Sequence, residues 1–311
     1  MSIAFVFPGQ GSQSVGMLAE LAGNFSIVAD TFAEASEALG YDLWQLVQNG
    51  PAEELNKTHI TQPAMLTSGI AVWRVMQDQG RAKPAVVAGH SLGEYTALVA
   101  AGVISFADAV KLVAERGRLM QEAVPAGQGG MAAILGLDDA TVINVCESAA
   151  QGDVLSAVNF NAPGQVVVAG TAAAVERVVD AAKEAGAKRA LPLPVSVPSH
   201  CALMKPAADK LAEQLSAITI ATPIIPVINN VDVTVASDAD AIRDALVRQL
   251  YSPVRWVESV QKMAQDGVDT LVECGPGKVL VGLNKRIENS MNAMAVFDAA
   301  SLEKALAELP A

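Results

Sequence analysis

The chain has 311 residues, of which 51% are hydrophobic and 17% are charged, a composition typical of a globular protein with a sizeable core. Its formal net charge of −12 disfavours nucleic-acid binding, and no apolar stretch approaches the ~20 residues that span a membrane. The three cysteines lack C-x-x-C spacing, which argues against a zinc site and favours a reducing compartment. We therefore expect a cytoplasmic protein that binds neither nucleic acid nor membrane. We also expect a monomer.

The first part of the chain alternates short apolar runs with longer amphipathic stretches. It predicts strands at 3–7 and 84–88 and helices at 25–39, 63–79, 92–98 and 105–124. Gly40 and Gly80 end the first two helices, and Pro63 occupies a first-turn position. The last part predicts strands at 224–228 and 271–274 and helices at 204–218, 240–250, 257–265 and from about 278 to 286. Strands separated by helices favour a mostly parallel, doubly wound sheet.

The middle of the chain, 126–197, has a different pattern. It predicts strands at 131–137, 154–159, 165–169 and 189–195 and helices at 140–150 and 173–185. The order β-α-β-β-α-β is that of a ferredoxin-like fold. We therefore predict an α/β protein in which 1–125 and 198–311 form one discontinuous α/β domain and 126–197 form an inserted α+β subdomain.

Residues 89–93 read Gly-His-Ser-Leu-Gly, the G-x-S-x-G pattern of a nucleophile elbow, between a predicted strand and a predicted helix. The sharp turn crowds the backbone, so small residues are needed on both sides of Ser91. Backbone N–H groups at the start of the helix would face an oxyanion formed beside this serine. In the alternative interpretation, Ser91 only caps the helix after a glycine-rich turn.

A nucleophilic serine needs a base, and the chain offers His59, His90 and His200. His90 adjoins the serine, where an elbow turns neighbouring side chains apart, and we expect His59 to lie in a surface loop. His200 follows the nucleophile along the chain, as in hydrolases with such an elbow, and is the predicted base. Cys201 is the rival nucleophile, although buried and inert thiols are much commoner.

No acidic residue between Ser91 and His200 stands out as the third member of a triad. Expelling an amine needs a strongly supported histidine, whereas a thiol leaves readily because its pKa is only ~8.5. A dyad whose histidine is oriented by a carbonyl group would therefore be sufficient for thioester chemistry.

Arg116 lies in a helical row with Leu112, Leu119 and Ala123, whereas Arg118 shares a face with charged residues. A buried arginine is costly unless an acceptor meets it. The spacing leaves two partners equally open, an internal carboxylate or the anion of a substrate.

The glycine-rich run 7–13, Phe-Pro-Gly-Gln-Gly-Ser-Gln, fits neither a dinucleotide loop nor a P-loop, and it could donate a backbone N–H to an oxyanion. Other motifs accompany this run along the chain: 89–94, the helix of Arg116, Asn-Phe-Asn-Ala-Pro-Gly-Gln at 159–165, Pro-Ser-His at 198–200 and Gly-Pro-Gly at 275–277. Together, and over essentially the whole chain, they resemble the malonyl-CoA:acyl carrier protein transacylase family, in particular its bacterial stand-alone type.

The resemblance implies a hydrolase-like α/β fold with an inserted ferredoxin-like subdomain. It implies a ping-pong transfer of the malonyl group from malonyl-CoA to the phosphopantetheine thiol of holo acyl carrier protein, for fatty acid synthesis, without a cofactor or metal. It also assigns roles to single residues. These are the nucleophile Ser91, the base His200, the malonyl carboxylate ligand Arg116, the oxyanion-hole N–H donors Gln10 and Leu92, and Gln249 for the main-chain carbonyl that orients the base.

Two alternatives remain open beside this assignment. A serine hydrolase would use the same elbow and base but pass the acyl group to water, and a non-catalytic binding module would form no acyl-enzyme. Acyl carrier proteins are acidic, so docking to this acidic chain would need a local basic patch. We expect the basic pairs to flank the mouth of the cleft, namely Lys188, Arg189, Lys285 and Arg286.

Overall fold

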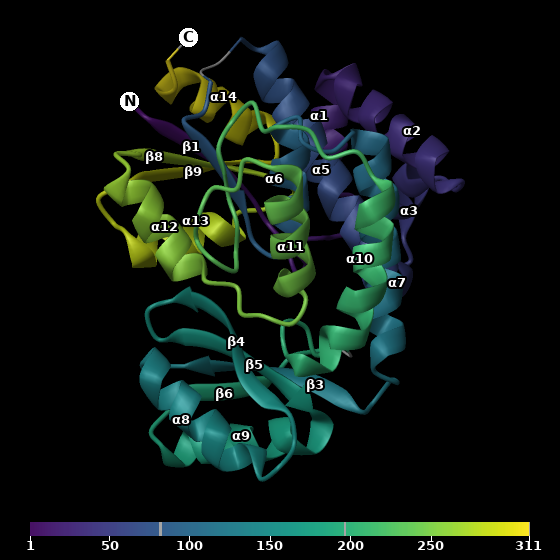
Figure 1. Ribbon diagram of the computed structural model, residues 1–311. Coiled ribbons are helices and arrows are strands. Elements are labelled where there is room, and N and C mark those ends of the chain that lie inside the picture. The colour runs from purple at the N-terminus through teal and green to yellow at the C-terminus, as the bar shows by residue number, and fades with distance from the viewer. Residues whose placement is uncertain (81–82, 196, 311) are drawn as a thin grey trace.

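The computed structural model describes residues 1–80, 83–195 and 197–310, which contain two sheets (Figure 1). The strands of the larger sheet are all parallel and follow the order β7 (Val227–Ile228), β2 (Val86–Gly89), β1 (Ile3–Phe7), β8 (Thr270–Cys274) and β9 (Asn292–Val296). Phe7 at the end of β1 is paired with Gly89 at the end of β2. The segments that follow these two strands therefore meet at one edge of the sheet, where α/β proteins commonly bind ligands.

Helices cover both faces of this sheet, as a doubly wound fold requires. Alternate strand residues face opposite sides: Phe5 and Phe7 enter the larger core, and Ala4 and Val6 enter the smaller one. The larger core contains residues from α1 (Ala19–Asn24), α2 (Ser26–Leu39), α3 (Leu43–Asn49), α4 (Ala52–Leu55), α5 (Thr58–Asp78), α6 (Leu92–Ala100), α7 (Phe106–Ala123), the 3₁₀ turn Ala202–Met204, α10 (Lys205–Ala217), α11 (Ala239–Gln249) and α14 (Ala299–Glu308). The smaller core contains residues from α12 (Trp256–Gln265) and α13 (Val279–Ile287).

The second sheet is antiparallel, in the order β4 (Leu155–Ala162), β5 (Gln165–Thr171), β3 (Gly129–Leu135) and β6 (Arg189–Pro192). Helices α8 (Asp139–Ala150) and α9 (Ala172–Glu184) pack on one of its faces (Figure 1). This is the ferredoxin-like arrangement, and all of its elements come from the predicted segment 126–197. The domain boundaries at 125/126 and 197/198 stay a prediction.

Strand β4 connects the second sheet to the first unit. The N–H of Phe160 donates to the carbonyl of Val254 at 3.0 Å, and the N–H of Val254 donates to the carbonyl of Val158 at 2.8 Å. His90, beside the end of β2, contacts Asn161 of β4 through Nε2 and Oδ1 at 2.7 Å. These bonds hold the second sheet against the edge of the main sheet at which β1 and β2 end.

Several expectations about element boundaries are wrong. Helix α5 begins at Thr58 rather than at Pro63, so Pro63 lies inside the helix and His59 lies in its first turn, not in a surface loop. The early turn packs closely against α7, where a Cβ on Gly117 would lie 2.6 Å from the Cα of His59. Strands β6 and β7 are shorter than predicted, and each lacks the part of the predicted run that contains a proline, Pro194 or Pro226, whose nitrogen cannot donate to a ladder.

Several elements were not anticipated: α1, α3, α4, β9 and α14. By length and hydropathy, none of the helices in the described ranges could cross a membrane.

Candidate active site

Ser91 occupies a tight turn between β2 and α6, with φ 51° and ψ −107°, a conformation that residues with a Cβ rarely adopt. Both flanking glycines are required. A Cβ on Gly89 would lie 1.9 Å from the carbonyl carbon of Gly93, and a Cβ on Gly93 would lie 2.0 Å from the carbonyl oxygen of Phe7. The Ser91 side chain makes no capping bond to α6. The geometry is that of a nucleophile elbow and does not support the helix-cap alternative.

Ser91 and His200 are in direct contact, with Oγ and Nε2 2.7 Å apart. The Nδ1 of His200 lies 2.7 Å from the carbonyl oxygen of Gln249. A carbonyl oxygen can only accept, so Nδ1 carries the proton and Nε2 is left as the acceptor for the serine hydroxyl. A main-chain carbonyl therefore takes the position of a triad acid, as the resemblance implied.

His200 is 3% exposed and adopts a left-handed φ of 66°. Burial, and secondarily the charge of Arg116, lowers the pKa of His200 to about 3. The imidazole is consequently neutral at physiological pH and can accept a proton. Ser91 and His200 are both non-glycine residues with a positive φ, so backbone strain lies where the structure has brought the reactive groups together.

Arg116 reaches the same point from α7 and is 1% exposed. Its Nη1 donates to Oε1 of Gln62 at 2.8 Å, and its Nη2 donates to Oε1 of Gln249 at 3.1 Å and to Oγ of Ser91 at 3.3 Å. Within the described ranges no carboxylate forms an ion pair with it, and its Nε has no partner. The buried cation is thus held by neutral amides, and a substrate anion is the better supported of the two partners considered for it.

The side chain of Gln249 connects these groups, which sequence reasoning did not anticipate. Its Nε2 donates to the carbonyl of Ser91 at 3.0 Å and to Oε2 of Glu94 at 2.8 Å, while Oε1 faces Arg116. Asn230 holds the elbow from the other side. Its Oδ1 accepts from the N–H of Ser91 at 2.7 Å, and its Nδ2 donates to the carbonyl of Gly89 at 2.7 Å.

Gln62 was also missed. It lies in 60–72 of α5, a continuous run of buried residues. The run also contains Thr61, Thr67 and Ser68, so a polar residue in it does not stand out from the sequence or identify a partner.

A cavity of about 150 Å³ opens beside the dyad. Ser91, His200 and Gln10 line it from the main sheet's side, and Met131 and Asn159 are among the residues that line it from the second sheet. The loop of Gln10 packs on the elbow, since a Cβ on Gly9 would lie 2.7 Å from the carbonyl oxygen of His90.

Leu92 is buried and is the first residue of α6, where backbone N–H groups have no partner within the helix. The structure therefore places Gln10 and Leu92 beside the nucleophile, and their role as oxyanion-hole donors stays a prediction.

His90 and Cys201, the other candidates for the base and the nucleophile, are engaged in other contacts. His90 is bound to Asn161, and burial lowers its pKa. Cys201 is buried, its Sγ donates to the carbonyl of Pro198 at 3.2 Å, and burial raises its pKa to about 11. Such a thiol is a poor nucleophile because little thiolate is present.

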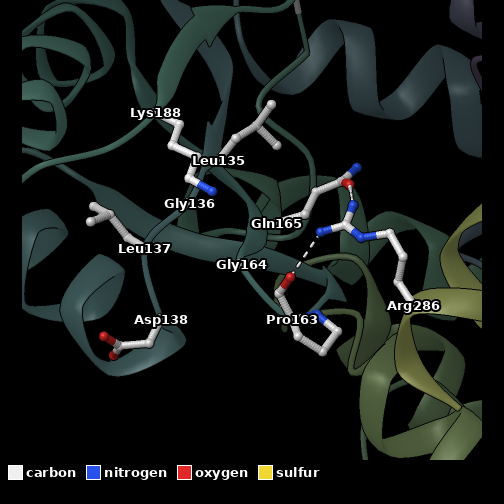
Figure 2. A pocket seen from close by; sticks show the side chains of 9 residues that line it. All are labelled: Leu135, Gly136, Leu137, Asp138, Pro163, Gly164, Gln165, Lys188 and Arg286. Atoms are coloured by element: carbon white, nitrogen blue, oxygen red, sulfur yellow. Dashed lines mark hydrogen bonds between the residues drawn. The ribbon is translucent and has the colours of Figure 1, made fainter.

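The four basic residues predicted to dock a carrier protein are all exposed, and none of them lines the Ser91 cavity. Lys188 and Arg286 instead line a separate cavity of about 460 Å³ between the units, shown in Figure 2. Arg286 is partly engaged there, because it donates to the carbonyl of Pro163 at 2.8 Å and to Oε1 of Gln165.

Comparison with known proteins shows the family to which the chain belongs. The acyl transferase domain family matches residues 4–302. The chain is 67% identical over 305 residues to the malonyl CoA-acyl carrier protein transacylase of Salmonella typhimurium (98% of this chain, 99% of that protein). It is 65% identical over 303 residues to that of Escherichia coli K12 (97% and 98%).

Solved structures of the same family are similar in fold over nearly the whole chain. An acyl carrier protein S-malonyltransferase from Vibrio cholerae is 62% identical, with a TM-score of 0.96 over 98% of this chain and 99% of that one. A malonyl-transacylase in complex with its type II polyketide synthase acyl-carrier protein is 61% identical, with a TM-score of 0.98 over 99% of both chains.

Proposed function

Because this chain belongs to the acyl transferase family, and within it to the malonyl CoA-acyl carrier protein transacylases, we propose that it transfers malonyl groups from malonyl-CoA to holo acyl carrier protein, for fatty acid synthesis. The observation that carries the proposal is the Ser91–His200 contact of 2.7 Å beside a buried guanidinium whose hydrogen-bond partners, among the described residues, are all uncharged. The first feature suits acyl transfer, and the second suits an acyl group that ends in a carboxylate.

The reaction divides into two halves with the same machinery. In the first, Ser91 Oγ attacks the thioester carbonyl and passes its proton to Nε2 of His200. The tetrahedral intermediate collapses, the C–S bond breaks, and the proton returns to the departing CoA thiolate. In the second half, His200 takes the proton of the phosphopantetheine thiol, whose sulfur attacks the malonyl-serine ester, and Ser91 leaves as a hydroxyl.

Two backbone N–H groups, those of Gln10 and Leu92, would stabilise the oxyanion of each tetrahedral intermediate. Their location supports this role, because Leu92 follows Ser91 as the first residue of α6 and Gln10, in the loop after β1, lines the same cavity as Ser91. The N–H of Ser91 itself is occupied by Asn230. The Nη2 of Arg116, 3.3 Å from Ser91 Oγ, would bind the malonyl carboxylate.

The reaction written above balances without a cofactor or metal, and malonyl-CoA enters it only as a substrate. We also propose a cytoplasmic monomer. The location is supported by three cysteines that are all buried and free, as expected in a reducing compartment.

Carrier-protein docking would use Lys188, Arg189, Lys285 and Arg286. The shared cavity of Lys188 and Arg286 supports this, because one residue of each basic pair lines it, together with a single acidic residue, Asp138 (Figure 2). Charge reversal at Lys188 and Arg286 should slow transfer to carrier protein at low salt and leave transfer to free pantetheine unchanged. Lys304→Glu, an exposed site on α14, is the control. An unchanged carrier-protein rate would exclude this surface.

Intact mass spectrometry after mixing with malonyl-CoA tests the function. One malonyl group should be added, at Ser91, and Ser91→Ala should abolish it. His200→Ala should slow its formation by the ~10²–10⁴ that general-base help contributes. A normal adduct on Ser91→Ala would refute the assignment. Rapid loss of the adduct to water without a thiol acceptor would indicate the hydrolase alternative.

A further inference from the structure

Glu94 is a buried carboxylate that the mechanism above does not use. It is 2% exposed and occupies the third position of α6. A glutamate at this position commonly folds back to the N–H of the capping residue. Here that N–H, of Ser91, is bound by Asn230 instead. Glu94 is turned toward Gln249 and accepts from its Nε2 at 2.8 Å and from the N–H of Asn230 at 2.9 Å, both through Oε2.

These bonds decide which way the Gln249 amide points. An amide can rotate to exchange its oxygen and nitrogen. Glu94 and the carbonyl of Ser91 only accept, so both require the NH₂ of Gln249. The oxygen must then face Arg116, where it accepts at 3.1 Å. Glu94 therefore acts on Arg116 through the amide of Gln249.

The Gln249 amide also separates the charges of Glu94 and Arg116. Burial raises the pKa of Glu94 to about 7 and lowers the pKa of Arg116, and against this burial effect each charge favours the charged form of the other. The two groups form no ion pair, because Gln249 stands between them. A carboxylate directly on Arg116 would satisfy the guanidinium and compete with a substrate anion for it. A carboxylate one side chain away partly balances the buried charge and leaves the guanidinium free.

We propose that Glu94 is a positioning residue for acyl-group selection, which fixes the Gln249 amide and serves as a spaced counter-charge so that Arg116 remains open to the malonyl carboxylate. This inference rests on the proposed function. It makes Glu94 a determinant of which acyl group is accepted, although it does not contact that group.

The test is a competition between malonyl-CoA and acetyl-CoA for acylation of Ser91, followed by intact mass, with thermal unfolding measured in parallel. Glu94→Met removes the acceptor at similar length. Its preference for malonyl over acetyl should fall ~10- to 100-fold, in line with the loss of a buried hydrogen bond to a charged group. Glu94→Gln keeps an acceptor oxygen but removes the counter-charge, so its preference should lie between those of the wild type and Glu94→Met. Glu122→Met, at an exposed glutamate of α7, is the matched control.

A purely structural role would lower stability and slow both acyl groups alike, so an unchanged preference in folded Glu94→Met would overturn the inference. If that variant does not fold, the exchange Glu94→Gln with Gln249→Glu decides. It places the carboxylate directly on Arg116 and should abolish the malonyl preference, and a retained preference would overturn the inference. Failure of the wild-type protein to form malonyl-Ser91 would instead refute the proposed function.

Discussion

The sharpest consequence of the site concerns Arg116, whose replacement by alanine should change which acyl group is transferred. The guanidinium is 1% exposed and is held by the oxygens of Gln62 at 2.8 Å and Gln249 at 3.1 Å, both uncharged. A malonyl carboxylate would supply the missing anion, and an acetyl group would not. Removing one partner of such a buried pair costs about 3–5 kcal/mol, which corresponds to a factor of ~10²–10⁴ in transfer.

The assay compares kcat/KM for malonyl-CoA and acetyl-CoA with the same carrier protein. Arg116→Ala should reduce malonyl transfer by that factor and leave acetyl transfer steady or faster, since an unpaired charge leaves the pocket. Arg116→Lys should recover part of the loss, because an ammonium lacks the planar fork that binds a carboxylate through two bonds. Arg118→Ala is the control, because Arg118 is exposed on α7 and pairs with Glu115 and Glu122.

An equal fall of malonyl and acetyl transfer in Arg116→Ala would refute the reasoning. So would loss of the folded state, detected by thermal unfolding, because Arg116 would then be a structural residue whose amide partners cannot be left unpaired.

Three further predictions concern the free energy of unfolding. Folding lowers the pKa of His200 from its ordinary value of 6.5 to about 3, so the protein should lose stability as the pH falls below 6.5, by up to about 1.4 kcal/mol per pH unit. His200→Ala should remove this pH-dependent loss, and parallel pH profiles of the wild type and the variant in chemical denaturation would contradict the prediction. Gly93→Ala should give little folded protein on size exclusion, because its Cβ would lie 2.0 Å from a carbonyl oxygen; normal yield and melting temperature would argue against the tight elbow. Asn230→Ala should cost about 1–3 kcal/mol in urea unfolding by leaving the N–H of Ser91 unpaired, and an unchanged midpoint would show that water replaces the amide.

The parts of the molecule that could be predicted from sequence are those encoded within a few residues. The elbow depends on the spacing of Gly89, Ser91 and Gly93, and the ferredoxin-like unit on its order of short runs, and both are present as predicted. Boundaries were less predictable where packing overrides local preference, as at His59, where the glycine that permits the early turn lies in another helix.

The supporting residues of the site could not be predicted for a different reason. Asn230 and Gln249 are 139 and 158 residues from Ser91 and meet it only after the main sheet has formed. Gln249 was assigned through its backbone carbonyl, on the basis of family resemblance, whereas the partners of its amide depend on two other helices. Pairwise contacts over such distances leave no periodic trace in a single sequence.

Residues of both structural units line the Ser91 cavity. The dyad and its hydrogen-bonding partners belong to the main sheet's side, while Met131 and Asn159 reach the cavity from the second sheet. The second sheet therefore shapes part of the cavity without carrying a proton-transfer group. A substitution at Met131 or Asn159 would change the shape of that wall and leave the Ser91–His200 contact in place.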